Sequence, residues 1–241
     1  MESHSQTPPP TRPRQTLLFD ADDTLWENNV YFERAIAAFI SYLDHRLHTP
    51  QEVREHLNRV ERATIAQHGY GMKSFRRSLI TCFEHLTAEP VSEDQHHRIV
   101  SFVDSIAAQE IELLPGVADT LRQLAKRHEL HLVTKGDVIE QNDKLDRSGL
   151  RPYFKEVEVL PEKTEAAYRA LAQQHRFPAH ATWMIGNSPK SDINPSLAAG
   201  WNAVFIPHDF TWVLEHEVVD VPVPGCTLLE LASFSALLDH F

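Results

Sequence analysis

The chain has 241 residues, of which 34 are acidic and 23 are basic, and its formal net charge at pH 7 is −11. This acidic balance argues against nucleic acid as the main partner, because binding to the phosphate backbone requires a basic surface. The apolar fraction of 42% and the charged fraction of 24% are those of an ordinary globular protein. With only two cysteines, Cys82 and Cys226, far apart in the sequence, a disulfide framework is not indicated.

The first 15 residues are polar and rich in proline, and they contain no hydrophobic signal region. We expect residues 1–15 to be a disordered leader. No apolar run approaches the ~20 residues that a membrane-spanning helix needs, so no membrane partner is expected. A cytoplasmic location follows by elimination.

Short apolar runs alternate with helical patterns along most of the chain. The runs predict strands over residues 16–19, 130–134, 156–160, 182–185 and 203–206. Amphipathic patterns predict helices over residues 117–127, 138–148, 163–175 and 193–199. Such alternation is typical of right-handed βαβ units. The expected fold class is therefore α/β, with a Rossmann-like three-layer core and a parallel central sheet over residues 16–28 and 111–241.

Residues 29–110 break this alternation. Apolar residues recur there every three or four positions, in stripes that begin at Phe32, Val53, Met72 and Ile99. We expect this segment to be an inserted, all-helical cap domain. Ligands of open α/β sheets bind outside the carboxyl ends of the strands. Because the insert leaves the sheet just after the first strand, it would cover such a site.

The first strand ends in Asp20-Ala21-Asp22-Asp23-Thr24. A carboxylate such as that of Asp20 can attack phosphorus and form an acyl phosphate. A second carboxylate, Asp22, can protonate the leaving oxygen and later deprotonate the attacking water. Close carboxylates also raise each other's proton affinity and offer hard oxygen ligands to Mg²⁺. Taken alone, a solvated turn explains the pattern equally well.

Three further patches follow later strands. Thr134 ends a strand and is followed by a glycine and a predicted helix. Its hydroxyl and the nearby N–H groups could donate hydrogen bonds to a phosphate oxygen. Alternatively, the segment is a turn that caps the helix. Lys163 stands at the start of a predicted helix, where the helix dipole disfavours lysine unless its ammonium reaches an anion site or solvent. The loop over residues 186–195 contains oxygen ligands suited to Mg²⁺, or is a simple turn.

In this order, the four patches resemble the haloacid dehalogenase-like (HAD) hydrolase superfamily, whose members carry Asp-x-Asp-x-Thr, a Ser/Thr, a Lys and an acidic Gly loop. The resemblance covers residues 16 to about 208, and the helical insert is similar to the family's C1-type cap. It implies an enzyme, a phosphatase that uses Mg²⁺ and acts on a small phosphorylated metabolite through an aspartyl-phosphate.

The resemblance also implies a role for each matching residue. Asp20 would be the nucleophile and Asp22 the general acid/base. Thr134 would hold the phosphoryl oxygen, and Lys163 would neutralise the nucleophile and the phosphate. The implied substrate-binding residues are Thr134, Lys135 and Lys163. The implied metal ligands are Asp20, the backbone carbonyl of Asp22, Asn187 and Asp192.

Two residues depart from the family pattern. Asn187 stands where an aspartate usually follows the glycine, which weakens the metal site without abolishing it. Lys135 stands where asparagine usually follows the Ser/Thr, so it either adds a cation near the phosphate or points outward. The family's dehalogenases lack the second aspartate, so Asp22 favours phosphoryl chemistry. A phosphomutase or a non-catalytic phosphate- or protein-binding module is the alternative, and the protein is expected to be a monomer or a homodimer.

Overall fold

The computed structural model describes residues 13–43 and 47–241. Within these ranges, one six-stranded parallel sheet has the order β3-β2-β1-β4-β5-β6. The strands are β1 (Thr16–Phe19), β2 (Glu129–Lys135), β3 (Glu156–Leu160), β4 (Thr182–Gly186), β5 (Asn202–Phe205) and β6 (Leu228–Glu230). The chain runs outward from β1 in one direction through β2 and β3 and in the other through β4 to β6. The sheet therefore has a switch point between β1 and β4, where open α/β sheets bind ligands.

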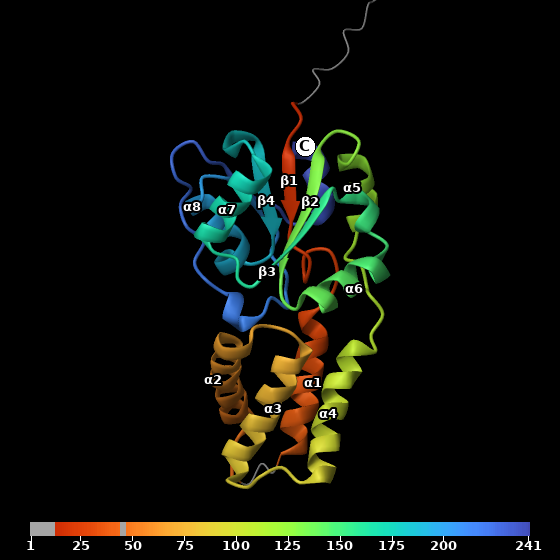
Figure 1. The fold of residues 1–241 in the computed structure, drawn as a ribbon, viewed down its shortest axis with the longest axis vertical. Helices are drawn as coiled ribbons and strands as arrows, with labels where there is room; N and C mark the ends of the chain where they lie inside the picture. Colours follow the sequence, from red (N-terminus) through yellow and green to blue (C-terminus); the bar gives the residue numbers. More distant parts are fainter. Residues whose placement is uncertain (1–12, 44–46) are drawn as a thin grey trace, which may run out of the picture.

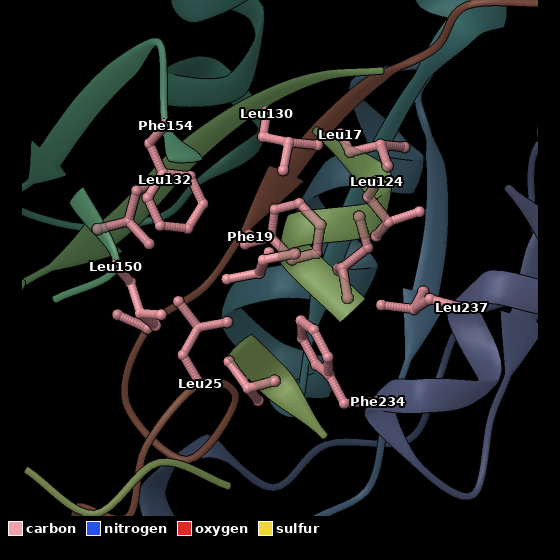
Figure 2. Close-up of a cluster of buried hydrophobic side chains, with 14 of the residues drawn as sticks. Leu17, Phe19, Leu25, Leu124, Leu130, Leu132, Leu150, Phe154, Phe234 and Leu237 are labelled. Atoms are coloured by element: carbon pink, nitrogen blue, oxygen red, sulfur yellow. The ribbon is translucent and has the colours of Figure 1, made fainter. Parts of the chain in front are cut away.

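Successive side chains of β1 pack on opposite faces of the sheet, as the two-residue period of a strand requires. Leu17 and Phe19 join the larger core cluster, in which Phe19 packs between Phe154 and Phe234 (Figure 2). Leu18 joins a separate cluster on the other face. All three side chains are fully buried, which explains why the strand reads as a continuous apolar run.

Helices cover both faces of the sheet (Figure 1). The core helices are α5 (Val117–Leu124), α6 (Val138–Ser148), α7 (Glu165–His175), α8 (Asn194–Ala198) and α9 (Leu237–His240). Apolar residues of α5, α6 and α9 belong to the larger cluster, whereas those of α7 belong to the cluster on the other face. Short helical turns complete the core at Arg151–Tyr153, Ala179–Ala181, Pro189–Ile193, Val213–Glu215 and Phe234–Ala236. This three-layer arrangement confirms the predicted α/β class.

Between β1 and β2 the chain forms a bundle of helices with an apolar core of its own. The helices are α1 (Asn29–Tyr42), α2 (Pro50–His68), α3 (Met72–Thr87) and α4 (Glu93–Ala107). Thr49 and Ser92 each begin a helix with a reciprocal side-chain cap, to Glu52 and Gln95 respectively. The bundle lies beyond the carboxyl ends of the strands (Figure 1). It therefore stands where the sheet's switch point presents a site.

The core differs from the sequence prediction at the start of α7 and at the edge of the sheet. Helix α7 begins at Glu165, because the Thr164 hydroxyl accepts the N–H of Ala167 and caps it, so Lys163 lies in the preceding loop rather than in the helix. The short strand β6, which was not predicted, pairs with β5 at the edge of the sheet.

The predicted leader, residues 1–15, lies mostly outside the described residues. Its last residue, Gln15, is ordered: its carbonyl accepts the Glu129 N–H and its side chain accepts the Trp183 indole N–H. The core therefore begins at Gln15 at the latest. Across residues 13–43 and 47–241, no helix combines the length and the apolar character that crossing a bilayer would require.

Candidate active site

The carboxylate of Asp20, directly after β1, is held by two side chains from different parts of the chain. The Lys163 ammonium donates to Asp20 Oδ1 at 2.5 Å, and the Thr24 hydroxyl lies 3.0 Å from Asp20 Oδ2. The backbone N–H of Asp20 donates to the Ile185 carbonyl of β4, which fixes the residue at the switch point. Asp20 and Lys163 are both buried. The structure therefore brings Asp20 and Lys163, two of the predicted site residues, into direct contact.

A second buried carboxylate, Asp192, shares the same ammonium. Lys163 Nζ lies 2.7 Å from Asp192 Oδ1, and the Ser188 N–H donates to Asp192 Oδ2 at 3.0 Å. Gly186 makes this approach possible: a Cβ there would lie 2.2 Å from Asp192 Oδ2. Burial lowers the pKa of Lys163, but the charges of Asp192 and Asp20 outweigh it and raise the pKa, so the ammonium stays charged. Burial and the Asp20 charge raise the pKa of Asp192.

Asn187 faces this cluster with its amide oxygen. Asn187 Oδ1 lies 3.1 Å from the Thr24 hydroxyl, and its amide N–H donates to the Thr211 hydroxyl at 3.0 Å. The bond to Thr211 fixes the amide orientation. The Thr24 hydroxyl thus lies between the Asn187 amide oxygen, which carries no charge, and the carboxylate of Asp20.

Asp22 has surroundings that the sequence did not reveal. Lys144 donates to both of its carboxylate oxygens, at 2.8 and 3.1 Å, and Gln141 and the Trp26 indole each donate at 2.8 Å. Burial raises the pKa of Asp22, but Lys144 and these hydrogen bonds outweigh it, so the pKa lies below its usual value. The carboxylate charge of Asp20 does raise the pKa of Asp23 and Asp192, whereas at Asp22 the contacts with Lys144, Gln141 and Trp26 leave the pKa lowered.

Thr134 and Lys135 end β2 at the same edge of the sheet. Thr134 is buried and lines the cavity described below. Lys135 neither points outward nor stands free: its ammonium donates to Glu215 Oε1 at 2.7 Å and to the Ser191 hydroxyl at 2.8 Å. Burial lowers the pKa of Lys135, but Glu215 and its other acidic neighbours outweigh it and raise the pKa. Lys135 thus organises the wall of the site with Glu215, a residue that the sequence analysis missed.

One cavity of about 300 Å³ lies between the sheet and the helical bundle. Its wall contains every predicted site residue: Asp20, Asp22, Thr134, Lys135, Lys163, Asn187 and Asp192. The opposite wall comes from α1, α2 and α3 and includes Phe32, Glu61 and Phe75. The site is therefore enclosed by the bundle rather than open to solvent on that side.

Hydrogen bonds between the bundle and the core hold the segment that joins α2 and α3. The Tyr70 hydroxyl donates to Glu162 Oε2 at 2.7 Å and accepts from Lys135 at 3.2 Å. The Met72 N–H donates to the Glu140 carboxylate at 3.0 and 3.1 Å. A core residue thus accepts a hydrogen bond from a backbone N–H in the first turn of α3, which has no partner within the helix. These bonds keep the bundle over the site.

The residues around Asp20 suit a hard divalent cation. Asp20 and Asp192 share the single ammonium of Lys163, which leaves surplus negative charge in a buried space. Burial, and after it the charge of Asp20, raise the pKa of Asp192, and a bound cation would offset both effects. The available donors are carboxylate, amide and backbone carbonyl oxygens, the set that Mg²⁺ and Ca²⁺ prefer.

A different trio, Asp23, Glu27 and His208, is the one group of three acidic or histidine side chains in the described ranges whose ligand atoms lie within 4.8 Å of one another. The Asp23 carboxylate also accepts hydrogen bonds from the backbone N–H groups of Asn28 and Asn29, at the N-terminus of α1. Burial raises the pKa of Asp23 to about 7. This trio stands at the start of the bundle and is not the predicted ligand set.

A model described as haloacid dehalogenase-like hydrolase matches residues 15–200. The chain belongs to this family. A solved HAD-like hydrolase from Xanthomonas campestris is 30% identical, with a TM-score of 0.78 over 95% of this chain and 94% of that one. The resemblance proposed from the four motifs is thereby confirmed.

The chain is also similar to two further bacterial proteins. Pyrimidine 5′-nucleotidase PynA of Streptococcus pneumoniae is 32% identical over 140 residues, or 55% of each chain. YfnB of Bacillus subtilis, solved with magnesium bound, is 18% identical with a TM-score of 0.66 over 95% of this chain and 99% of that one, which shows a shared fold. A 2-haloacid dehalogenase from Pseudomonas syringae, 21% identical with a TM-score of 0.60 over 94% of this chain and 97% of that one, shares this fold as well. The family match identifies the chain as a hydrolase.

Proposed function

We propose that this HAD-family hydrolase is a Mg²⁺-dependent phosphomonoesterase that works through an aspartyl-phosphate on Asp20. The observation that carries the proposal is the carboxylate of Asp20, which Lys163 and Thr24 hold in the wall of the cavity between the sheet and the bundle. A fixed carboxylate with an ammonium 2.5 Å away can approach a phosphate dianion without the repulsion that two anions would otherwise suffer.

In the first step an Asp20 oxygen attacks phosphorus, and the alcohol oxygen leaves with the electron pair of the broken P–O bond. In the second, water attacks the phosphoryl group and releases inorganic phosphate and the Asp20 carboxylate. Lys163 offsets negative charge in both steps, and the Thr134 hydroxyl donates to a phosphoryl oxygen. Asp20, Asp192, Asn187 and the Asp22 carbonyl would hold Mg²⁺, which supplies positive charge to the phosphoryl oxygens when bound.

Asp22 is the proposed proton carrier: it protonates the leaving alcohol and then accepts a proton from water. With its pKa lowered, chiefly by Lys144, it is a carboxylate at neutral pH, which suits the second step. The first step requires a proton on Asp22. We therefore propose that substrate binding loosens the contact with Lys144, since losing that charge raises the pKa of the carboxyl group.

Small phosphorylated metabolites are the proposed substrates, and the similarity to PynA makes nucleoside 5′-monophosphates the first to test. We propose that the protein acts on them in the cytoplasm as a monomer or homodimer, without a nucleic-acid or membrane partner. A dehalogenase would use Asp20 on carbon instead of phosphorus. Asp22 weighs against it, because cleavage of a carbon–halogen bond needs no acid for the leaving halide, whereas an alkoxide leaving group does.

The test is turnover of p-nitrophenyl phosphate by the purified chain, with Mg²⁺ and with excess EDTA. We expect hydrolysis that requires Mg²⁺ and no release of chloride from 2-chloropropionate. Chloride release without phosphate release would replace the proposal with dehalogenation. Absence of both, in a folded protein, would favour the non-catalytic module or a phosphomutase.

A further inference from the structure

Glu61 is a buried carboxyl group in the roof of the cavity, and the chemistry proposed above does not use it. It lies on α2, on the same face as Val53 and Leu57, and only 5% of the residue is exposed. It lines the same cavity as Asp20. The cavity is thus continuous from the proposed nucleophile to a carboxyl group inside the bundle.

Glu61 has an oxygen without a protein partner. Its Oε2 atom is buried and makes no hydrogen bond within the described residues. Arg54, whose charge acts on Glu61, donates its Nη2 to Glu33 on α1 at 2.6 Å, and its buried Nη1 makes no hydrogen bond within the described residues either. The oxygens of a buried carboxyl group normally accept hydrogen bonds, because burying a polar atom without a hydrogen-bond partner costs free energy. Burial raises the pKa of Glu61 to about 7, which expresses that cost. An acceptor kept in such a place indicates a ligand that brings its own hydrogen-bond donor.

Other side chains of the bundle that line the same cavity show what kind of ligand fits. Phe32 and Phe75 meet edge to face with their ring centroids 4.9 Å apart, and both line the cavity with Ile65 and Met72. A polyol such as a sugar phosphate would leave hydroxyls unpaired against these apolar groups. A flat heteroaromatic ring would instead bury its faces on them and present N–H groups at its edge.

We propose that Glu61 accepts a hydrogen bond from an N–H of a nucleobase and so selects nucleoside 5′-monophosphates, with Phe32 and Phe75 packing on the base. This proposal rests on the proposed function, because the phosphate of the same molecule would lie at Asp20. Glu61 would be a specificity-determining residue that takes no part in the phosphoryl transfer.

The experiment measures binding and turnover separately. The Asp20→Asn protein is titrated calorimetrically, with Mg²⁺ present, with uridine, cytidine, adenosine and guanosine 5′-monophosphates and with ribose 5-phosphate. The nucleotide that binds most tightly is then compared with an analogue in which the N–H groups at the edge of its base are methylated. The titrations are repeated with Glu61→Leu and Glu61→Gln added. Hydrolysis of p-nitrophenyl phosphate by the single Glu61 variants serves as the control.

We expect at least one nucleotide to bind at least tenfold more tightly than ribose 5-phosphate and its own methylated analogue. Glu61→Leu should remove that difference and leave p-nitrophenyl phosphate turnover within twofold of the parent. Equal binding of the nucleotides and ribose 5-phosphate would overturn the inference, and so would undiminished nucleotide binding by Glu61→Leu. The comparison with the methylated analogue needs no Glu61 variant, so it tests the inference even if those variants fail to fold. Base-dependent binding without any phosphatase activity would overturn the proposed function alone.

Discussion

The ammonium of Lys163 lies 2.5 Å from Asp20 Oδ1, although 143 positions separate the two residues in the sequence. The same ammonium reaches Asp192 at 2.7 Å, so one cation serves two buried carboxylates. Charges of this kind are expensive to leave unpaired. The contact is therefore both a structural tie between the loops that follow β1, β3 and β4 and the electrostatic centre of the site.

Lys163→Met should destabilise the protein by about 3–5 kcal/mol in EDTA, because it leaves two buried carboxylates without their cation. Mg²⁺ should restore more stability to this variant than to the parent, since a divalent cation would offset the same charges. Urea denaturation with and without Mg²⁺ measures both effects. Lys155→Met is the matched control, because the Lys155 pair with Glu129 is exposed and should change stability by less than about 1 kcal/mol. Equal losses in the two variants would contradict this account of Lys163.

Asn187→Asp should tighten Mg²⁺ binding about tenfold, or roughly 1.4 kcal/mol, by adding a charge to the oxygen that faces Asp20. Loss of the amide N–H bond to Thr211 and repulsion from Asp20 and Asp192 keep the gain far below the full Coulomb energy. The measurement is a Mg²⁺ titration of activity at fixed ionic strength. Asn194→Asp adds the same charge at a residue that does not line the cavity and should leave the Mg²⁺ requirement unchanged. A shift of equal size in both variants would mean that only net charge matters.

Tyr70→Phe should weaken closure of the helical bundle over the site. It removes the hydroxyl that donates to Glu162 and accepts from Lys135, while the ring remains. We expect KM for the preferred substrate to rise about three- to tenfold, the equivalent of one ordinary hydrogen bond, with a smaller change for p-nitrophenyl phosphate. Tyr42→Phe is the control, because Tyr42 packs on Phe83 and Phe102 within the bundle. Should both variants show the same kinetics, the Tyr70 contact would have no part in closure.

Glu61→Gln should stabilise the protein increasingly as pH rises. The pKa of Glu61 lies at about 7 in the folded protein against 4.5 in a free side chain, so the unfolded state releases its proton first. The cost of the buried charge is absent below pH 4.5, grows between pH 4.5 and 7, and is full above that range, at about 3 kcal/mol. Thermal unfolding of parent and variant at pH 5 and pH 8 measures it. An equal gain at both values would mean that Glu61 does not change its protonation state over this range.

Much of the fold could be read from the sequence because its signals are local. The apolar run before Asp20 predicts a doubly buried strand, and in the structure Leu17 and Phe19 face one layer while Leu18 faces the other. The helical stripes likewise predict the bundle. Strand β6 carries only three residues at the edge of the sheet, so its run was too short to separate from a loop.

The proposed catalytic residues could be located because motif order and strand ends place them together. Their partners could not, because contacts such as Lys144 with Asp22, or Glu215 with Lys135, depend on how distant segments pack. Glu61 left one local signal, a charged residue on the apolar face of α2 four positions after Leu57. From the sequence alone, a charged residue at that position could equally lie at the exposed edge of the helix, and only the structure shows that Glu61 is buried.

The central claim, that Asp20 becomes phosphorylated, can be tested directly. The protein is mixed with p-nitrophenyl phosphate and Mg²⁺, quenched in acid during turnover and reduced with borohydride, which converts an acyl phosphate of aspartate to homoserine. Peptide mass spectrometry then locates the change. The account predicts homoserine at position 20 alone, and neither label nor turnover in Asp20→Asn. Turnover with the label at another residue, or undiminished turnover in Asp20→Asn, would contradict it.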